Sequence, residues 1–206
     1  MSALLIRNAR IASENETTLR DGDVLVVDGV IRSIGFNLSV PEGAKVVDAR
    51  GRVLMPAMFD THVHFREPGQ EAKETIATGS EAAINGGITG IVMMPNTSPA
   101  IDSPAVVKQV LESAAKNARI PIYTSGCVTK GRHGKELAAI DGMRALGVKM
   151  LTDDGDTTGD PAVLYRAMQY ATEFGMFFAS HCEVPELAGP RALNEGAVSY
   201  RLGIKG

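Results

Sequence analysis

The segment that decides the fold is Met55-Pro56-Ala57-Met58-Phe59-Asp60-Thr61-His62-Val63-His64. It starts in an apolar run, Val53–Met58, that is typical of a short strand, and it ends in two histidines one residue apart. Because residues i and i+2 of a strand point to the same side, His62 and His64 are expected to share one space at or just past the strand end. Two neutral imidazoles placed in this way suit a divalent metal such as zinc. The alternative is a solvated loop that carries two polar residues.

Downstream of this segment, strand-like runs alternate with helical patterns. Further strands are expected at Ile88–Met94, Ile120–Ser125, Val148–Leu151 and Met176–Ser180. Helices are expected at roughly Thr75–Asn85, from Asp102-Ser103-Pro104 onward, in a shorter stretch that ends at Gly147, and from Asp160-Pro161 to Gly175. This alternation predicts an α/β fold with a parallel sheet and helices outside it.

Upstream of the segment, the sequence predicts strands only. Asp28-Gly29 lies between two strand-like runs and is a strong hairpin signal, because both central residues of such a turn favour positive φ. We therefore expect two domains. Residues 1–52 form a small all-β module, a β-sandwich, and residues 53–206 form the α/β domain.

Composition excludes several other classes of protein. The 206 residues are 44% hydrophobic and 22% charged with a net charge of −3, which is typical of a soluble globular chain and gives no reason to expect nucleic-acid or membrane binding. The apolar runs are too short for a membrane span. Cys127 and Cys182 lie far apart and do not suggest a disulfide framework, so we expect a cytoplasmic location.

Polar side chains follow two more of the expected strands. His181 follows Met176–Ser180 directly, and Asp153 and Asp154 follow the strand that ends at Leu151. Alone, Asp-Asp-Gly reads as an acidic turn. Because the carboxyl ends of parallel strands carry the functional groups of barrels and open sheets, three strand ends bearing metal-capable groups favour a metal site there.

These motifs together resemble a known family. The run from Met55 through His64 to Gly69, together with Met94-Pro95-Asn96-Thr97, Thr152-Asp153-Asp154-Gly155 and His181-Cys182-Glu183, is similar to the amidohydrolase superfamily and, within its cyclic amidohydrolase branch, to the type I dihydroorotases. The resemblance covers the whole chain. It implies a (β/α)₈ TIM-like barrel and the interconversion of N-carbamoyl-L-aspartate and dihydroorotate in pyrimidine biosynthesis.

The resemblance also implies roles for individual residues. His62 and His64 would bind one zinc, Asp154 would bind or bridge, and His181 would complete the site or bind a second zinc, with two zinc ions per complete active site. Asp154 is preferred to Asp153 because its spacing to His64 and His181 looks like the family's. Arg66 and Asn96 would hold the substrate carboxylate, roles that suit a guanidinium fork and an amide.

Neighbouring families offer an alternative function. Hydantoinases, dihydropyrimidinases and allantoinases share the paired histidines but usually bridge their metals with a carboxylated lysine. The nearby lysine here, Lys149, comes too early, and Thr152 takes the expected place. Whether Lys149 is carboxylated stays open, but Arg66 favours a substrate with a carboxylate.

The length predicts that part of the family's barrel is missing. After residue 52 there remain 206 − 52 = 154 residues, with about five βα units, whereas a complete barrel takes ~250 residues. No histidine or aspartate follows His181, so no catalytic residue is assigned and the general acid/base aspartate is expected beyond residue 206. We expect a truncated chain that is inactive alone. The family also allows a homodimer, an aspartate transcarbamoylase partner, or a non-catalytic scaffold for a transcarbamoylase.

Two minor features complete the sequence-based expectations. Lys130, Arg132 and Lys135 form a small basic patch that reads as a solvated loop, and Glu183 is a candidate support for a metal ligand.

Overall fold

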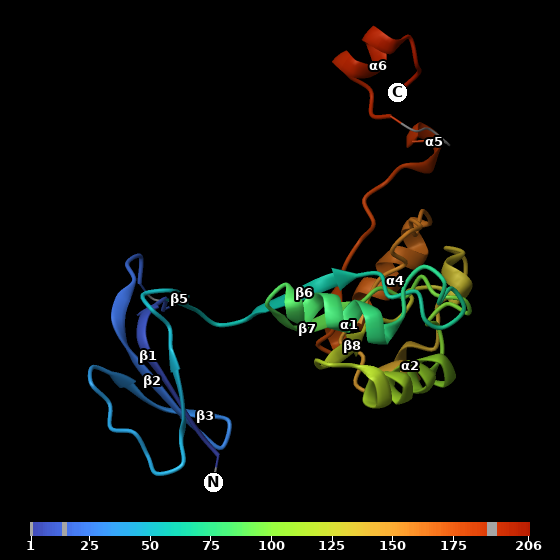
Figure 1. The fold of residues 1–206 in the computed structure, drawn as a ribbon. Helices are drawn as coiled ribbons and strands as arrows, with labels where there is room; N and C mark the ends of the chain where they lie inside the picture. The colour runs from blue at the N-terminus through green and yellow to red at the C-terminus, as the bar shows by residue number, and fades with distance from the viewer. Residues whose placement is uncertain (1, 14–15, 189–192) are drawn as a thin grey trace. The chain divides into compact units, whose positions relative to one another are not determined.

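The computed structural model describes residues 2–13, 16–188 and 193–206, and the chain divides into two compact units, Met1–Ala57 and Met58–Gly206 (Figure 1). The division lies five residues after the expected end of the first domain at residue 52.

The first unit is a five-stranded mixed sheet. Its strands are β1 (Ala3–Ile11), β2 (Arg20–Val27), β3 (Val30–Gly35), β4 (Lys45–Asp48) and β5 (Val53–Leu54). The order is β3-β2-β1-β4, with β5 also paired to β1; β1 to β3 are antiparallel, and β4 and β5 run parallel to β1. The expected hairpin is confirmed, since Asp28 and Gly29 both have positive φ, 48° and 76°.

The expected strand Val53–Met58 is wrong. Val53 and Leu54 pair with β1 of the first unit, whereas the first strand of the second unit, β6, runs over Met58–Val63. Pro56 lies between them, and a proline cannot donate a ladder hydrogen bond, which explains why the apolar run is divided. As a result His62 lies inside β6 and His64 just past it.

The second unit alternates strands with helices. Its strands are β6, β7 (Ile88–Met93), β8 (Ile122–Thr124), β9 (Met150–Leu151) and β10 (Phe177–Phe178). Its helices are α1 (Ile76–Asn85), α2 (Pro104–Asn117), the 3₁₀ turn η1 (Lys130–Arg132), α3 (Ile140–Ala145), α4 (Pro161–Glu173), α5 (Pro185–Ala188) and α6 (Ala197–Leu202). β6, β7 and β8 are parallel, as are β9 and β10. A parallel bridge between Gly126 and Leu151 links the two groups, so five strands follow one another in chain order.

Local signals explain where these helices begin. The Thr75 side chain accepts the Thr78 N–H at the start of α1, and Asp160 accepts the N–H groups of Ala162 and Val163 at the start of α4. Prolines occupy the first positions of α2 and α4, where the missing N–H costs no helical hydrogen bond.

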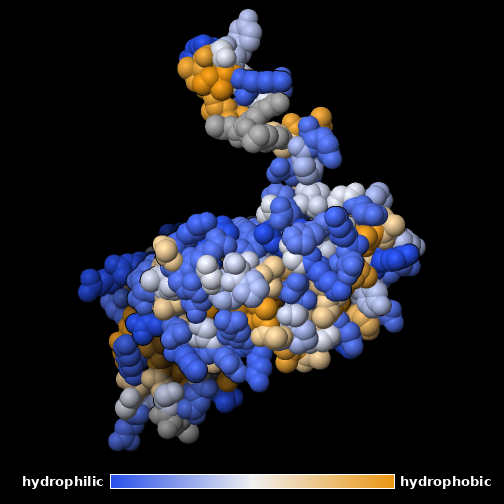
Figure 2. Space-filling view, turned by 90° about the vertical axis from the view of Figure 1, so that its right-hand side faces the viewer, coloured by the Kyte–Doolittle hydropathy of each residue, from blue (hydrophilic) through white to orange (hydrophobic). Residues whose placement is uncertain are grey.

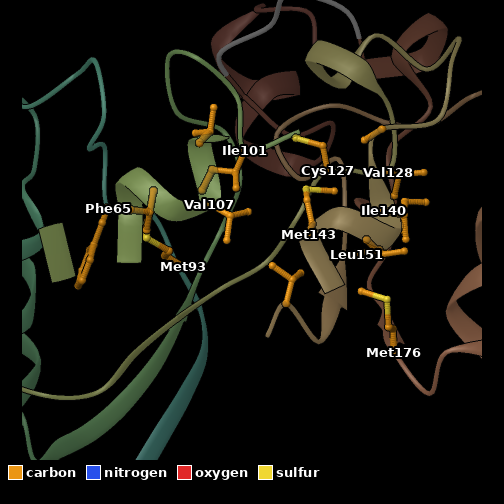
Figure 3. Packing of buried hydrophobic residues seen from close by; sticks show 14 of the residues in the cluster. Phe65, Met93, Ile101, Val107, Cys127, Val128, Ile140, Met143, Leu151 and Met176 are labelled. Atoms are coloured by element: carbon orange, nitrogen blue, oxygen red, sulfur yellow. The ribbon is translucent and has the colours of Figure 1, made fainter. Parts of the chain in front are cut away.

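The core of the second unit lies between the strands and their helices. Figure 3 shows its apolar side chains, among them Ile101 and Val107 near α2, and Met143 beside Cys127. Hydrophilic residues cover most of the face that Figure 2 shows, as expected for helices whose apolar residues point to the sheet. Within the described ranges, no helix has the length and apolarity that crossing a bilayer requires.

Candidate metal centre

The strand ends of the second unit bring four of the expected residues together. His62 and His64 come from the end of β6, Asp154 from the turn after β9, and His181 from the segment after β10. Because these strands are parallel and adjacent, their carboxyl ends lie at one edge, and residues up to 119 positions apart (181 − 62) become neighbours.

Asp154 lies at the centre of this group. Its Oδ2 lies 3.4 Å from Nε2 of His62 and 3.5 Å from Nε2 of His64, and its Oδ1 lies 3.2 Å from Nδ1 of His181. One ligand atom from each of His62, His64 and Asp154 lies within 4.8 Å of the others. Donors bound at 2.0–2.1 Å to a tetrahedral zinc lie about 3.4 Å apart, so these separations fit such an ion.

Exposure differs sharply across the group. The Asp154 side chain is 7% exposed, while those of His62, His64 and His181 are 52%, 34% and 32% exposed. A carboxylate therefore forms the floor of the site, and three imidazoles line its open side.

The adjacent Asp153 is bound differently. Its Oδ1 accepts the backbone N–H groups of Val128 and Thr129 at 2.9 and 3.0 Å, and its Oδ2 accepts the hydroxyls of Thr129 and Thr158 at 2.6 and 2.7 Å. These four donors satisfy the carboxylate, which joins the turn after β9 to the segment after β8. Asp153 has no free lone pair directed at the histidines.

Asn96 lies against the centre and fixes one of its imidazoles. It is 8% exposed, and its Oδ1 lies 3.0 Å from Nδ1 of His64. A proton on Nδ1, donated to this oxygen, leaves the Nε2 lone pair of His64 facing the Asp154 side, where a metal would bind. Sequence reasoning assigned Asn96 to the substrate alone and missed this contact.

His181 is held by contacts at both ring nitrogens and at its carbonyl. Nε2 lies 3.2 Å from Oε2 of Glu183, and the hydroxyl of Thr157 donates to the carbonyls of His181 and Glu183 at 3.0 and 2.9 Å. Burial lowers the pKa of His181, but the hydrogen bonds with Glu183 and Asp154 outweigh it and raise this pKa overall. Glu183 therefore contacts His181 on the side opposite Asp154.

The structure does not bring the other two sequence candidates into this group. Arg66 is partly buried in the turn after β6, and within the described part of the chain its guanidinium has no hydrogen bond or ion pair with Asn96 or the centre. Lys149 is exposed and precedes β9, whereas Asp154 follows it, so the two lie at opposite ends of that strand.

Arg132 is a site neighbour that sequence reasoning missed. The expected solvated patch is wrong for this residue, whose side chain is only 20% exposed and whose Nη1 donates to the carbonyl of Asp154 at 2.8 Å. Its charge gave no sign of this contact, since Lys130 and Lys135 of the same loop are exposed.

Comparison with known sequences fits this arrangement. A model of the family described as Dihydro-orotase-like matches residues 51–206. The chain belongs to the dihydroorotase-like family. This dihydroorotase-like chain is 40% identical over 203 residues to the dihydroorotase of Citrifermentans bemidjiense, covering 98% of this chain and 48% of the relative. It is 42% identical over 203 residues to that of Solibacter usitatus, covering 98% and 47%. The chain thus spans about half the length of the curated relatives it matches.

Solved structures place the fold among the TIM-barrel amidohydrolases. The L-hydantoinase of Arthrobacter aurescens matches with a TM-score of 0.72 and 23% identity, covering 85% of this chain and 39% of that one. The D-hydantoinase of a Thermus species matches with a TM-score of 0.69 and 28% identity, covering 89% and 41%. The α/β class expected from the sequence is confirmed at this level.

Proposed function

We propose that this chain carries the zinc-binding residues of a dihydroorotase, an enzyme that interconverts N-carbamoyl-L-aspartate and dihydroorotate in pyrimidine biosynthesis. The observation that carries the proposal is the buried carboxylate of Asp154, which has imidazoles at both of its oxygens. The relatives named dihydroorotase, which are about 40% identical over almost the whole chain, support the substrate.

The donor set suits zinc. His62, His64 and Asp154 would hold one ion, and His181 would take part in holding a second. A bound zinc polarises a carbonyl and makes water a stronger nucleophile at neutral pH. The protein's part is to keep the Asp154 oxygens and the imidazole lone pairs directed into one space.

Substrate binding is assigned to Arg66 and Asn96. Asn96 can serve both purposes, since its Oδ1 accepts from His64 while its Nδ2 can donate to a carboxylate. Arg66 follows His64 by two residues, so its guanidinium starts from the same turn and can pair with the carboxylate bidentately. Holding the carboxylate there would orient the reacting carbon of the ring.

The hydantoinase-type alternative is supported by the solved neighbours, several of which are hydantoinases. A carboxylated Lys149 as bridging ligand would need that side chain at the carboxyl end of β9, but Lys149 precedes the strand. We therefore prefer a site bridged by Asp154 and a substrate that carries a carboxylate.

We also infer that the five strands of the second unit form part of a (β/α)₈ barrel. Three aromatic side chains from different strands, Phe59, Tyr123 and Phe177, are 50%, 52% and 71% exposed and line one hollow. Such side chains fill the interior of a barrel whose strands surround them.

The general acid/base, a cytoplasmic location, a homodimer and an aspartate transcarbamoylase partner remain proposals from the family resemblance. The sequence-based boundary of the all-β module at residue 52 likewise stays a prediction, as does its description as a sandwich.

The proposal is tested by metal content and turnover. We expect zinc to bind to the 206-residue chain and to be lost in His62→Ala. Turnover of dihydroorotate, hydantoin and dihydrouracil is then measured for this chain and for the chain extended with the C-terminal half of the Solibacter usitatus relative. Dihydroorotase activity only in the extended chain is expected. A preference for hydantoin or dihydrouracil would overturn the substrate assignment.

The carboxylate role of Arg66 has its own test in the extended chain. Because a charge-assisted hydrogen bond is worth about 1.5–3 kcal/mol, Arg66→Ala should raise the Michaelis constant for dihydroorotate at least about tenfold. An unchanged Michaelis constant would show that Arg66 does not bind the carboxylate.

A further inference from the structure

The turn that carries Asp154 is contacted on both sides of this residue by one segment, Val128–Arg132, that follows β8. Asp153, on one side of Asp154, accepts the N–H groups of Val128 and Thr129. On the other side, Nη1 of Arg132 donates to the carbonyl of Asp154 at 2.8 Å and lies 2.9 Å from Oδ2 of Asp156. The segment Val128–Arg132 therefore contacts Asp153, the carbonyl of Asp154 and the side chain of Asp156.

The Asp154 carboxylate depends on these backbone contacts. Among the residues that the structure describes, its oxygens have no hydrogen-bond partner other than histidine ring nitrogens. The Asp154 N–H donates to Oγ1 of Thr152 at 3.0 Å, and the Asp154 carbonyl accepts from Arg132. The direction in which the carboxylate points is thus set by the main chain, and Arg132 is the only charged group among the described residues that holds that main chain directly.

The burial of Arg132 indicates that this contact is built into the fold. Its side chain is 20% exposed, and its Nε is fully buried without a partner in the described ranges. By comparison, Lys130 in the same turn is 64% exposed and pairs with Glu136 at the surface. Ion pairs as exposed as that one contribute little, whereas a buried guanidinium bound to a carbonyl fixes its position.

The backbone of Arg132 supports the same conclusion. Its φ is +61°, in the left-handed region that glycine and asparagine adopt much more readily than arginine. Strain of this kind persists where the side chain has a role that the surroundings require. The turn that it faces is equally restricted: a Cβ at Gly155, whose φ is +90°, would lie 2.9 Å from Nη1 of Arg132 and 3.0 Å from Nδ2 of Asn96.

We propose that Arg132 is a positioning residue for the metal centre, which keeps the Asp154 carboxylate directed at the histidines by holding the main chain of the turn. This inference rests on the proposed metal site. Loss of a residue that orients a ligand typically weakens metal binding about 10- to 100-fold, so this is the effect expected when the Arg132 side chain is removed.

The test measures Co²⁺ binding to the whole 206-residue chain from the visible absorption of the bound ion. Arg132→Asn should weaken Co²⁺ binding about 10- to 100-fold in a protein that still folds, because asparagine tolerates the positive φ. Arg132→Lys, which restores one charged donor, should bind with intermediate affinity. Lys130→Asn is the matched control, since it removes a cation two residues away, and should bind within about twofold of the unchanged chain.

The outcomes separate the two proposals. If His62→Ala binds Co²⁺ as well as the unchanged chain, the metal site itself is wrong. If His62→Ala loses binding while folded Arg132→Asn keeps it, the positioning role is wrong. If Arg132→Asn does not fold, Asp156→Asn is tested instead. Asp156 is exposed, so its substitution should not prevent folding. Because Asp156 pairs with Nη1 of Arg132, its loss should still weaken Co²⁺ binding about two- to fivefold. Unchanged Co²⁺ affinity in folded Asp156→Asn would then overturn the proposal.

Discussion

Each unit of the chain buries an aspartate, and the two carboxylates have opposite surroundings. Asp23 in the first unit is 6% exposed, and its two oxygens accept the backbone N–H groups of Asn8 and Leu38, each at 3.1 Å. Asp154 in the second unit is 5% exposed, but within the described residues only imidazoles contact its oxygens. A carboxylate supplied with N–H donors supports the fold, whereas one surrounded by potential metal ligands is suited to bind a cation.

The same contrast holds for the two units as wholes. In the first, Asp23 is the one buried polar residue among the described positions, and it receives an N–H that the bulge in β1 leaves outside the ladder. In the second, Ser80 and Ser199 are buried in helices, and the other buried polar residues among the described positions gather at the ends of β7, β8 and β9, namely Asn96, Thr97, Thr124, Ser125, Thr129, Thr152, Asp153 and Asp154. Burial of polar groups is costly unless they are bonded, so their concentration at one sheet edge marks that edge as functional.

The largest effect on the free energy of unfolding is expected at Asp153. Asp153→Ala leaves the buried N–H groups of Val128 and Thr129 without an acceptor, and each such group costs about 1–3 kcal/mol. We expect a loss of about 3–5 kcal/mol in chemical denaturation, and weaker metal binding because the turn is released. Asp156→Asn in the same turn is the control and should change stability by less than about 0.5 kcal/mol. If Asp153→Ala were as stable as the unchanged chain, the four hydrogen bonds that Asp153 accepts would contribute little to stability.

Asp154→Asn should weaken metal binding strongly and leave the free energy of unfolding almost unchanged. Among the described residues, no backbone N–H and no hydroxyl contacts this carboxylate, so its neutralisation relieves a desolvation cost and the metal-free protein should be as stable as before or slightly more stable. Metal affinity, measured by calorimetric titration with zinc, should fall at least about 100-fold because a shared ligand is lost. A variant that binds zinc normally would remove Asp154 from the centre.

The sequence predicted what depends on local pattern. The hairpin at Asp28-Gly29 and the starts of α2 and α4 follow from turn residues, caps and prolines, whose effects reach only a few positions. The division of Val53–Met58 between two units was missed because an apolar run does not show which sheet it joins.

Contacts within the site were harder to predict. Grouping the histidines with an aspartate needed only the expectation that parallel strands end at one edge. The contacts of Asn96 with His64 and of Arg132 with the Asp154 carbonyl depend on side chains that reach between positions 32 and 22 residues apart, respectively. No spacing rule connects such positions, and a lone arginine in a loop looks the same in sequence whether it is solvated or buried.

Asp23→Asn is expected to change stability alone and not metal binding, and it completes the comparison. In Asp23→Asn one oxygen remains to accept an N–H, while the new NH₂ group faces the N–H of either Asn8 or Leu38. We expect a loss of about 1–2 kcal/mol in stability, measured by chemical denaturation, and no change in zinc affinity. The change is the same as at Asp154, from carboxylate to amide in a buried position, so the two variants differ only in surroundings. If Asp23→Asn weakened zinc binding as Asp154→Asn does, the partners of a buried carboxylate would not distinguish support of the fold from metal binding in this chain.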